Sequence, residues 1–255
     1  MKVIILAGGF GTRLSEETAV IPKPMIDLGN RPLLWHIMKI FSSYGFNDFL
    51  IAMGYKSEAI KQYFLQLPNL ESDLRINLGT GEISKLTDFS ENWKIDLVHT
   101  GHDTMTGGRL KRLRNKIDGP TFITYGDGLS NIDLKKLLAF HKSHGKLATV
   151  TTIRPPQRFG VLELDNNKVT RFNEKIDCQE SWINGGFFVV EPEALDYIES
   201  DQTTWELEPC NNLARDGQLM AYKHDGYWQC VDTLHELREL RNAWNSNKAP
   251  WKVWD

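Results

Sequence analysis

The sequence predicts an α/β fold in which a mainly parallel, mixed sheet carries helices on both faces. Two observations lead to this prediction. Through the first 150 residues, short runs rich in β-branched residues alternate with amphipathic helical patterns, which is the rhythm of parallel strands joined by crossover helices. Beyond them strand-like runs dominate, so we expect a β-rich extension.

The elements follow in order from the apolar strand KVIILA at residues 2–7. Further strands are expected at 48–54, 94–98, 121–128, 148–154, 160–165, 168–174 and 182–190. Helices are expected at 31–45, 57–67, 107–117, 132–145 and 233–247. Residues 68–92 contain Pro68, Gly79 and Gly81 among scattered polar residues. That pattern fits either an irregular excursion or a pair of short strands.

Domain organisation and composition are those of an ordinary globular protein. No low-complexity linker or internal repeat divides the chain, so we expect one domain over residues 1–255. The net charge of −3 gives no argument for nucleic-acid binding. No apolar run reaches the roughly 20 residues of a membrane span, so no membrane partner is expected.

The cysteines point to a reducing compartment. Cys178, Cys210 and Cys230 are odd in number and form no CxxC pair. This favours reduced thiols in the cytoplasm over a disulfide framework or a zinc site.

A glycine loop follows the first strand in the stretch LAGGFGTRL. In an open α/β sheet, ligands bind beyond the carboxyl ends of the strands, and Gly8, Gly9 and Gly11 would let backbone N–H groups cradle phosphate oxygens there. The dinucleotide fingerprint GxGxxG fails because its third position is Leu14, and the second strand ends at Gly54 instead of an acidic residue. A dinucleotide-dependent oxidoreductase is therefore disfavoured.

Two cations accompany this loop. Arg13 lies within it, and Lys23 is held between Pro22 and Pro24 on a stiff segment. Fixed cations around an amide cradle suit a triphosphate and its departing pyrophosphate.

Two aspartates are candidate metal ligands. Asp127 follows a buried strand and is flanked by glycines, which favours a ligand over a turn residue that caps the next helix. Asp232 precedes a predicted helix, so an ordinary N-cap fits it as well as a metal ligand does. By contrast, His141 and His144 lie at a helix end with no acidic neighbour in sequence, and we expect them to be solvated.

The opening stretch resembles the signature GGxGTRLxxxTxxxPKPM of the nucleotidyltransferases that make nucleotide sugars from an NTP and a sugar 1-phosphate. The resemblance covers essentially the whole chain. It continues through MTGGRLKR (105–112), TYGDG (124–128), NEK (173–175), INGGFF (183–188) and WQCVDT (228–233). With KAPWKVWD at the end, the pattern is similar to that of the members that use CTP and glucose 1-phosphate. Ile176 and the pair Cys230–Val231 depart from the family pattern, which has proline and Pro-Met there.

The resemblance implies a Rossmann-like fold with a nucleotide-binding part at about 1–150, a β-rich sugar-binding extension at about 151–232, and a C-terminal helix and tail at 233–255. The implied reaction is Mg²⁺-assisted in-line attack of α-D-glucose 1-phosphate on CTP, giving CDP-glucose and pyrophosphate for deoxysugar and surface polysaccharide (lipopolysaccharide O-antigen) synthesis. A trimer-based homo-oligomer, such as a hexamer, is also implied. Two alternatives stay open, namely the same chemistry with another NTP or sugar, such as dTDP-glucose, and a non-catalytic regulatory subunit.

The resemblance also assigns roles residue by residue. Arg13, Lys23 and Asp127 are expected to be catalytic, and Asp127 and Asp232 to share one Mg²⁺. The expected substrate-binding residues, several acting through the backbone, are Leu6, Ala7, Gly8, Gly9, Phe10, Gly11, Thr12, Arg13, Lys23, Thr104, Arg109, Gly128, Glu174, Lys175, Asn184 and Gly185.

Overall fold

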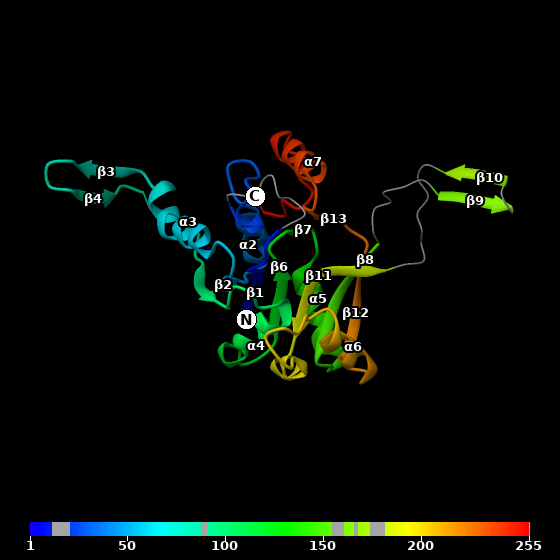
Figure 1. Cartoon of the computed structure of the whole chain (residues 1–255). Coiled ribbons are helices and arrows are strands. Elements are labelled where there is room, and N and C mark those ends of the chain that lie inside the picture. The colour runs from blue at the N-terminus through cyan, green and yellow to red at the C-terminus, as the bar shows by residue number, and fades with distance from the viewer. Residues whose placement is uncertain (12–20, 88–90, 155–160, 166–167, 174–181, 255) are drawn as a thin grey trace.

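The computed structural model describes residues 1–11, 21–87, 91–154, 161–165, 168–173 and 182–254. Its centre is a seven-stranded sheet of order β12-β8-β11-β6-β1-β2-β5 (Figure 1). The strands are β1 (Lys2–Ala7), β2 (Asp48–Met53), β5 (Lys94–His99), β6 (Thr121–Tyr125), β8 (Ala148–Ile153), β11 (Ile183–Val190) and β12 (Leu219–His224). Of these described strands, only β11 runs antiparallel to its neighbours. The prediction of a mixed, mainly parallel sheet is confirmed.

Apolar side chains alternate between the two faces of the sheet, and each face has its own core. In β1, Val3 and Ile5 belong to one core, and Ile4 and Leu6 belong to the other. The first core is covered by α2 (Leu33–Ser43), α5 (Leu134–His144) and α7 (Leu234–Asn245). The second is covered by α4 (Thr106–Arg112), the 3-10 helix η4 (Pro192–Tyr197) and α6 (Glu208–Arg215). Helices therefore lie on both faces, as expected.

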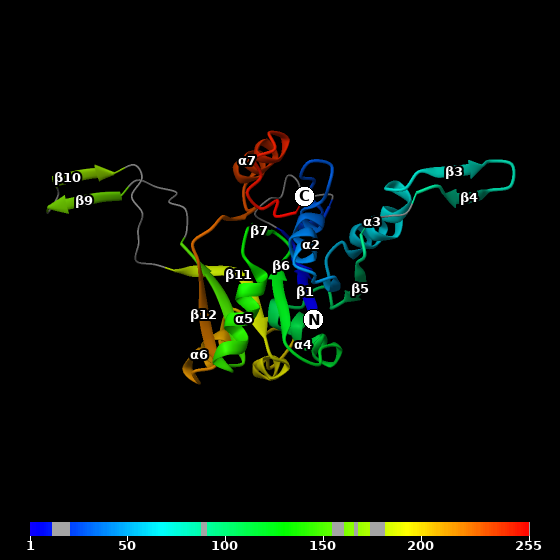
Figure 2. The same ribbon diagram turned by 180° about the vertical axis from the view of Figure 1, so that it is seen from behind.

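Two extensions leave the central sheet (Figures 1 and 2). One, here called the arm, spans residues 57–87 and contains α3 (Ser57–Leu70) and the hairpin of β3 (Leu74–Asn77) and β4 (Glu82–Lys85). The pair of short strands is thus the correct alternative for residues 68–92, and Pro68 lies inside α3. The other extension is the antiparallel hairpin of β9 (Val161–Asp165) and β10 (Lys168–Asn173).

The sequence patterns missed several short or half-buried elements. They are β12, the 3-10 helices η2 (Lys23–Met25) and η4, α6, and the small ladder of β7 (Gly128–Ser130) with β13 (Trp228–Cys230). The expected helix 107–117 is also divided, because α4 ends at Arg112 and a 3-10 turn, η3 (Arg114–Lys116), follows. Among the described residues, no helix is both long and apolar enough to span a bilayer.

The chain end returns to the body of the molecule. Trp251 is fully buried in the core under α2, α5 and α7, and the ring of Trp254 contacts Trp35 and His36 of α2. The C-terminal tryptophans therefore pack on the body of the molecule.

Candidate active site

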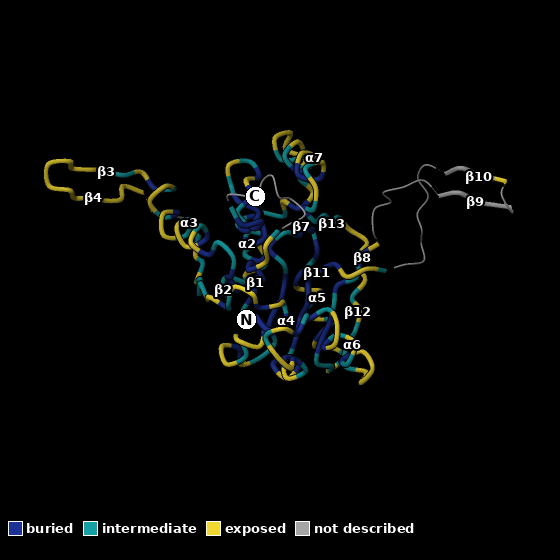
Figure 3. Tube along the Cα trace, in the orientation of Figure 1, coloured by how far each residue is buried: buried dark blue, intermediate teal, exposed yellow. Residues whose placement is uncertain are grey.

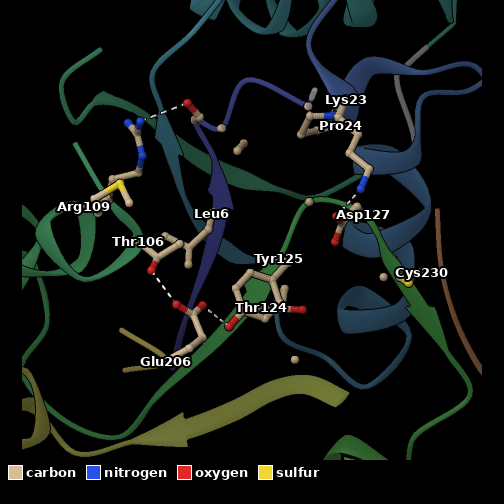
Figure 4. A pocket seen from close by; sticks show the side chains of 18 of the residues that line it. Leu6, Lys23, Pro24, Thr106, Arg109, Thr124, Tyr125, Asp127, Glu206 and Cys230 are labelled. Atoms are coloured by element: carbon tan, nitrogen blue, oxygen red, sulfur yellow. Dashed lines mark hydrogen bonds and ion pairs between the residues drawn. The ribbon is translucent and has the colours of Figure 1, made fainter. Parts of the chain in front are cut away.

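A cavity of about 640 Å³ opens at the carboxyl ends of β1 and β6. Its walls come from the glycine loop after β1, η2, the start of α4, the turn after β6, the first half of β11 and the β13 strand. Figure 4 shows the side chains that face this space. A ligand at this edge meets loops from both halves of the sequence, which is the usual location of a site in an open α/β sheet.

Lys23 lies between the two candidate metal ligands. Its Nζ is 2.6 Å from Asp127 Oδ2 and 2.7 Å from Asp232 Oδ1. Burial alone would lower the pKa of Lys23, but the charges of Asp127 and Asp232 and the hydrogen bonds to them raise it above its usual value. The lysine is therefore a fixed cation in the wall of the cavity.

Local packing explains how Lys23 reaches this position. Pro22 and Pro24 flank it, and the 3-10 turn η2 starts at the lysine itself. Pro24 packs on Gly126, where a Cβ would overlap the proline ring and crowd the carbonyl oxygen of Leu6. The proline pair and Gly126 together place the lysine beside the turn that carries Asp127.

The β7–β13 ladder brings the two aspartates together. Gly128 pairs with Cys230, and the Val231 N–H donates to the carbonyl oxygen of Asp127 at 3.0 Å. β7 directly follows Asp127, and β13 ends two residues before Asp232. The three residue pairs of the ladder therefore bring together two carboxylates that are far apart along the chain.

Neither aspartate is needed as a helix cap. The N-cap of α7 is Thr233, whose side chain accepts from the Glu236 N–H in a complete capping box, and the N-cap of α5 is Asp133. Asp127 and Asp232 are instead two hard oxygen donors directed at one point. Within the described residues no group of three or more His, Cys, Asp or Glu forms a metal site, so a cation here would take further ligands from water or a bound phosphate, as Mg²⁺ usually does.

Arg109 is a buried clamp on the glycine-loop side of the cavity. Its Nη2 donates to the carbonyl oxygens of Gly8 (2.9 Å) and His102 (3.2 Å). Its Nη1 donates to the carbonyl oxygens of Met53 and Gly101 and to Thr100 Oγ1, at 2.7–3.2 Å. The guanidinium thereby joins the ends of β1, β2 and β5. Burial lowers the pKa of Arg109 below its usual value.

Four glycines fit the backbone around this clamp. A Cβ at Gly8 or Gly54 would overlap the Arg109 guanidinium. Gly107 and Gly108 begin α4, but the backbone of residues 201–205 fills the space beside them. The small size of Gly107 and Gly108 therefore allows α4 to pack closely against residues 201–205. Nothing in the sequence pattern indicates that these two segments are in contact.

A second polar group in the cavity wall escaped the sequence analysis. Glu206 accepts hydrogen bonds from the Tyr125 hydroxyl and, at 2.6 Å, from Thr106 Oγ1. Nearby, the register of β11 shifts between Asn184 and Phe188, so Asn184 lines the cavity. Glu206 lies in the stretch TTWELEP, which carries no recognisable signal.

Most residues expected at the site do meet in this cavity. Those lining it are Leu6, Ala7, Gly8, Gly9, Phe10, Gly11, Lys23, Thr104, Arg109, Asp127, Gly128, Asn184, Gly185 and Asp232. Thr12, Arg13, Glu174 and Lys175 lie outside the described residues, as does Ile176. Cys230 lines the cavity too, and burial raises its pKa to about 12, so its thiol stays protonated.

The expectation for His141 was wrong. This residue is buried, with Nδ1 2.9 Å from Thr149 Oγ1 and Nε2 3.4 Å from Glu191 Oε1. Burial lowers its pKa. The partner Glu191 comes from the end of β11, fifty residues along the chain, and sequence proximity could not show it.

A glycine loop, a fixed lysine and two convergent carboxylates at the edge of such a sheet are typical of an enzyme of phosphate transfer chemistry. The family model described as "Nucleotidyl transferase" matches residues 2–247, so the chain belongs to that family.

Individual relatives agree with this. The chain is 48% identical over 257 residues to "Glucose-1-phosphate cytidylyltransferase" of Salmonella typhi, with all of both chains covered. It is 45% identical over 256 residues to "Probable glucose-1-phosphate cytidylyltransferase" of Bacillus subtilis, again over the full length of both. Among solved structures, HddC from Yersinia pseudotuberculosis has the same fold, with a TM-score of 0.69, 21% identity and coverage of 95% of this chain and 99% of that one.

Proposed function

We propose that this protein joins CTP and α-D-glucose 1-phosphate to give CDP-glucose and pyrophosphate. Full-length identity of 45–48% to proteins named for this activity supports the choice of both substrates. The observation that carries the proposal in the molecule itself is the position of Lys23 between Asp127 and Asp232 in a cavity closed by the glycine loop.

The reaction forms one bond and breaks one. A phosphate oxygen of glucose 1-phosphate attacks the α-phosphorus of CTP, and the bond from that phosphorus to the β-phosphate oxygen breaks to release pyrophosphate. The attacking oxygen is already ionised at neutral pH, so no general base is needed. Catalysis then depends on positioning two polyanions and on compensating their charge.

The residues of the chain divide this work by charge. Gly8, Gly9 and Gly11 offer backbone N–H groups to the triphosphate, and a Cβ at Gly9 would extend into open space where the ligand enters. Lys23 holds the α-phosphate or the incoming phosphate, and Arg13 holds the β- and γ-phosphates. Asp127 and Asp232 would bind Mg²⁺, which when bound neutralises charge on the phosphates in the transition state.

The remaining assignments follow the family pattern. Glu174, Lys175, Asn184 and Gly185 bind the sugar phosphate, within the β-rich part of a single domain, and Thr104 and Arg109 lie on the nucleotide side. We also infer a cytoplasmic homo-oligomer built on trimers.

The test is competition among CTP, UTP, dTTP and the purine nucleotides at equal concentration, with glucose 1-phosphate and Mg²⁺ and with products separated by mass. We expect kcat/KM for CTP to exceed that for dTTP and the purine nucleotides by at least about tenfold, with UTP second, because a pocket built for cytosine leaves polar groups unpaired with another base. A mixture dominated by dTDP-glucose would refute the choice of base. No nucleotide sugar from any substrate would support a regulatory subunit instead.

A further inference from the structure

A chain of hydrogen bonds runs along one wall of the cavity and is independent of the lysine and the two aspartates. Glu206 accepts from the hydroxyls of Thr106 and Tyr125. The ring of Tyr125 lies against Gly186, where a Cβ would overlap it, and Asn184 Oδ1 accepts from the Gly186 N–H at 2.8 Å. Hydrogen bonds thereby join three side chains, from α4, the loop before α6 and β6 (Figure 4), and the ring of Tyr125 extends the row to β11.

Each bond in this row has only one possible direction. A carboxylate accepts and cannot donate, so both hydroxyls must direct their protons at Glu206. The Gly186 backbone N–H can only donate, so at the other end of the row Asn184 Oδ1 is the acceptor. Burial, and then the charge of Glu206, raise the pKa of Tyr125 far above its usual value, so the phenol keeps this proton.

The two ends of the row belong to different elements of the cavity wall. Thr106 begins α4, the helix that carries the Arg109 clamp on the glycine loop, and its Oγ1 also accepts from the Trp205 N–H at 2.9 Å. Asn184 is next to Gly185, whose carbonyl oxygen accepts from Trp228 Nε1 at 2.7 Å. Figure 4 places Glu206 on the wall away from Lys23 and Asp127. A carboxylate there does not oppose the bound phosphates directly.

We propose that Glu206 is a positioning residue that couples the nucleotide side of the cavity to its sugar-phosphate side. It orients Thr106 on one side and, through Tyr125, Asn184 on the other. The identity of the two ligands rests on the proposed function, whereas the coupling itself rests on these contacts.

Kinetics of three single variants test the coupling. Thr106→Val should raise the KM for CTP by about tenfold and leave that for glucose 1-phosphate unchanged. Tyr125→Phe should raise the KM for glucose 1-phosphate by about tenfold and leave that for CTP unchanged. Glu206→Met, which keeps the volume of the side chain but removes both acceptors, should raise both KM values. The KM values of Glu206→Gln should lie between those of the wild type and those of Glu206→Met, because an amide can still accept from one of the two hydroxyls.

A double variant separates coupling from independent damage. Glu206→Met combined with Tyr125→Phe should raise the KM for glucose 1-phosphate no more than Glu206→Met alone does. Tyr197→Phe is the matched control, since Tyr197 also donates to a carboxylate, that of Asp216 at 3.1 Å, but on the exposed surface. It should leave both KM values as in the wild type.

Two results would overturn the proposal. One is additive effects in the double variant, and the other is a fall in kcat for Glu206→Met with both KM values unchanged in a protein of normal Tm. If the wild type turns over another nucleotide instead of CTP, the proposed function fails, and the same variants tested with that nucleotide still decide the coupling. Calorimetric titration with the nucleotide alone tests Thr106 and Glu206 in the same way without any turnover, since both variants should then bind it more weakly.

Discussion

At the scale of single residues, Lys23 bonds to carboxylates that lie 104 and 209 positions further along the chain. From its position in the sequence, Asp232 could equally be a helix cap or a metal ligand. The structure gives the cap to Thr233, so the Asp232 carboxylate can turn toward Lys23. A residue's neighbours in space therefore decide a question that its neighbours in sequence leave open.

The aspartates give the first prediction. Asp127→Asn and Asp232→Asn should each lower turnover by at least about a hundredfold, because each would remove one anionic ligand from the proposed Mg²⁺, which would neutralise charge in the transition state. Steady-state rates measured over a series of Mg²⁺ concentrations, with circular dichroism to verify folding, provide the measurement. Near-normal turnover at limiting Mg²⁺ in either variant would show that its carboxylate is no ligand.

The second prediction concerns Arg109, which donates to five oxygens. Arg109→Lys should lower the free energy of unfolding by about 2 kcal/mol, because one ammonium cannot replace the planar fork and leaves buried carbonyl groups unpaired. It should also raise the KM for CTP, since the glycine loop loses its tie to β2 and β5.

Urea denaturation and kinetics would measure both effects. Arg114→Lys is the control, because among the described contacts the Arg114 side chain bonds only to the exposed carboxylate of Asp196, at 3.1 Å. Equal stability losses in the two variants would contradict the role of Arg109 as a clamp.

At the scale of elements, α2 and the C-terminal tail are joined through one buried histidine. His36 Nε2 is 2.7 Å from the carbonyl oxygen of Leu28, and its Nδ1 accepts from Trp251 Nε1 at 3.4 Å. The rings of Trp35, Trp244 and Trp254 surround it. This arrangement requires the neutral imidazole with its proton on Nε2.

The third prediction follows from that requirement. Burial lowers the pKa of His36 from 6.5 to about 4, so the unfolded chain binds more protons than the folded one between these values. The neutral His36 therefore contributes its full share to the free energy of unfolding above about pH 6.5. This share is lost as the pH falls toward 4, and the total loss is about 3 kcal/mol. Urea denaturation of the wild type and of His36→Met between pH 7.5 and 4.5 should show a steeper loss in the wild type. If the free energy of unfolding fell equally with pH in both proteins, the role of His36 would be contradicted.

At the scale of the whole molecule, the arm extends away from the central sheet and ends in a two-stranded hairpin. A two-stranded ribbon is marginal in water by itself, and Figure 3 shows most of the β3–β4 hairpin exposed. Large apolar side chains are nevertheless exposed on it, and these are Leu65, Leu70, Ile76, Leu78, Ile83 and Leu86. Single exposed apolar residues are ordinary, but a series of them on one extension favours an interface.

The fourth prediction uses this series. If the protein is a homo-oligomer, Leu78→Asp with Ile83→Asp should reduce its mass in solution to that of a smaller species, because charges would enter a desolvated contact. Light scattering coupled to size-exclusion chromatography measures the mass. Leu207→Asp alters an exposed leucine outside the arm and should leave the mass unchanged. An unaltered oligomer in the arm variant would exclude this surface.

The sequence allows prediction of features that depend on local patterns. The alternation of strands and helices, the loop of Gly8 and Gly9, and Lys23 between two prolines all follow from a few adjacent residues. The ladder at Gly128 and Cys230 is too short for any periodicity, and β12 is a half-buried edge strand. Glu206 and Arg109 act through partners about fifty to a hundred residues away, so their roles depend on tertiary structure alone.

The ammonium of Lys23 also serves as a resident counterion. With two carboxylates and one ammonium, the trio carries a formal charge of −1 in place of the −2 of a bare pair of aspartates. A divalent cation that binds without the nucleotide would be attracted less strongly than by two aspartates alone. It would also be repelled by the Lys23 ammonium, which already contacts both carboxylates. Triphosphate offers Lys23 other oxygens and brings its own negative charge. The order of assembly should therefore be nucleotide and metal together, with weak affinity for the free ion, and turnover would then follow the concentration of the metal–nucleotide complex.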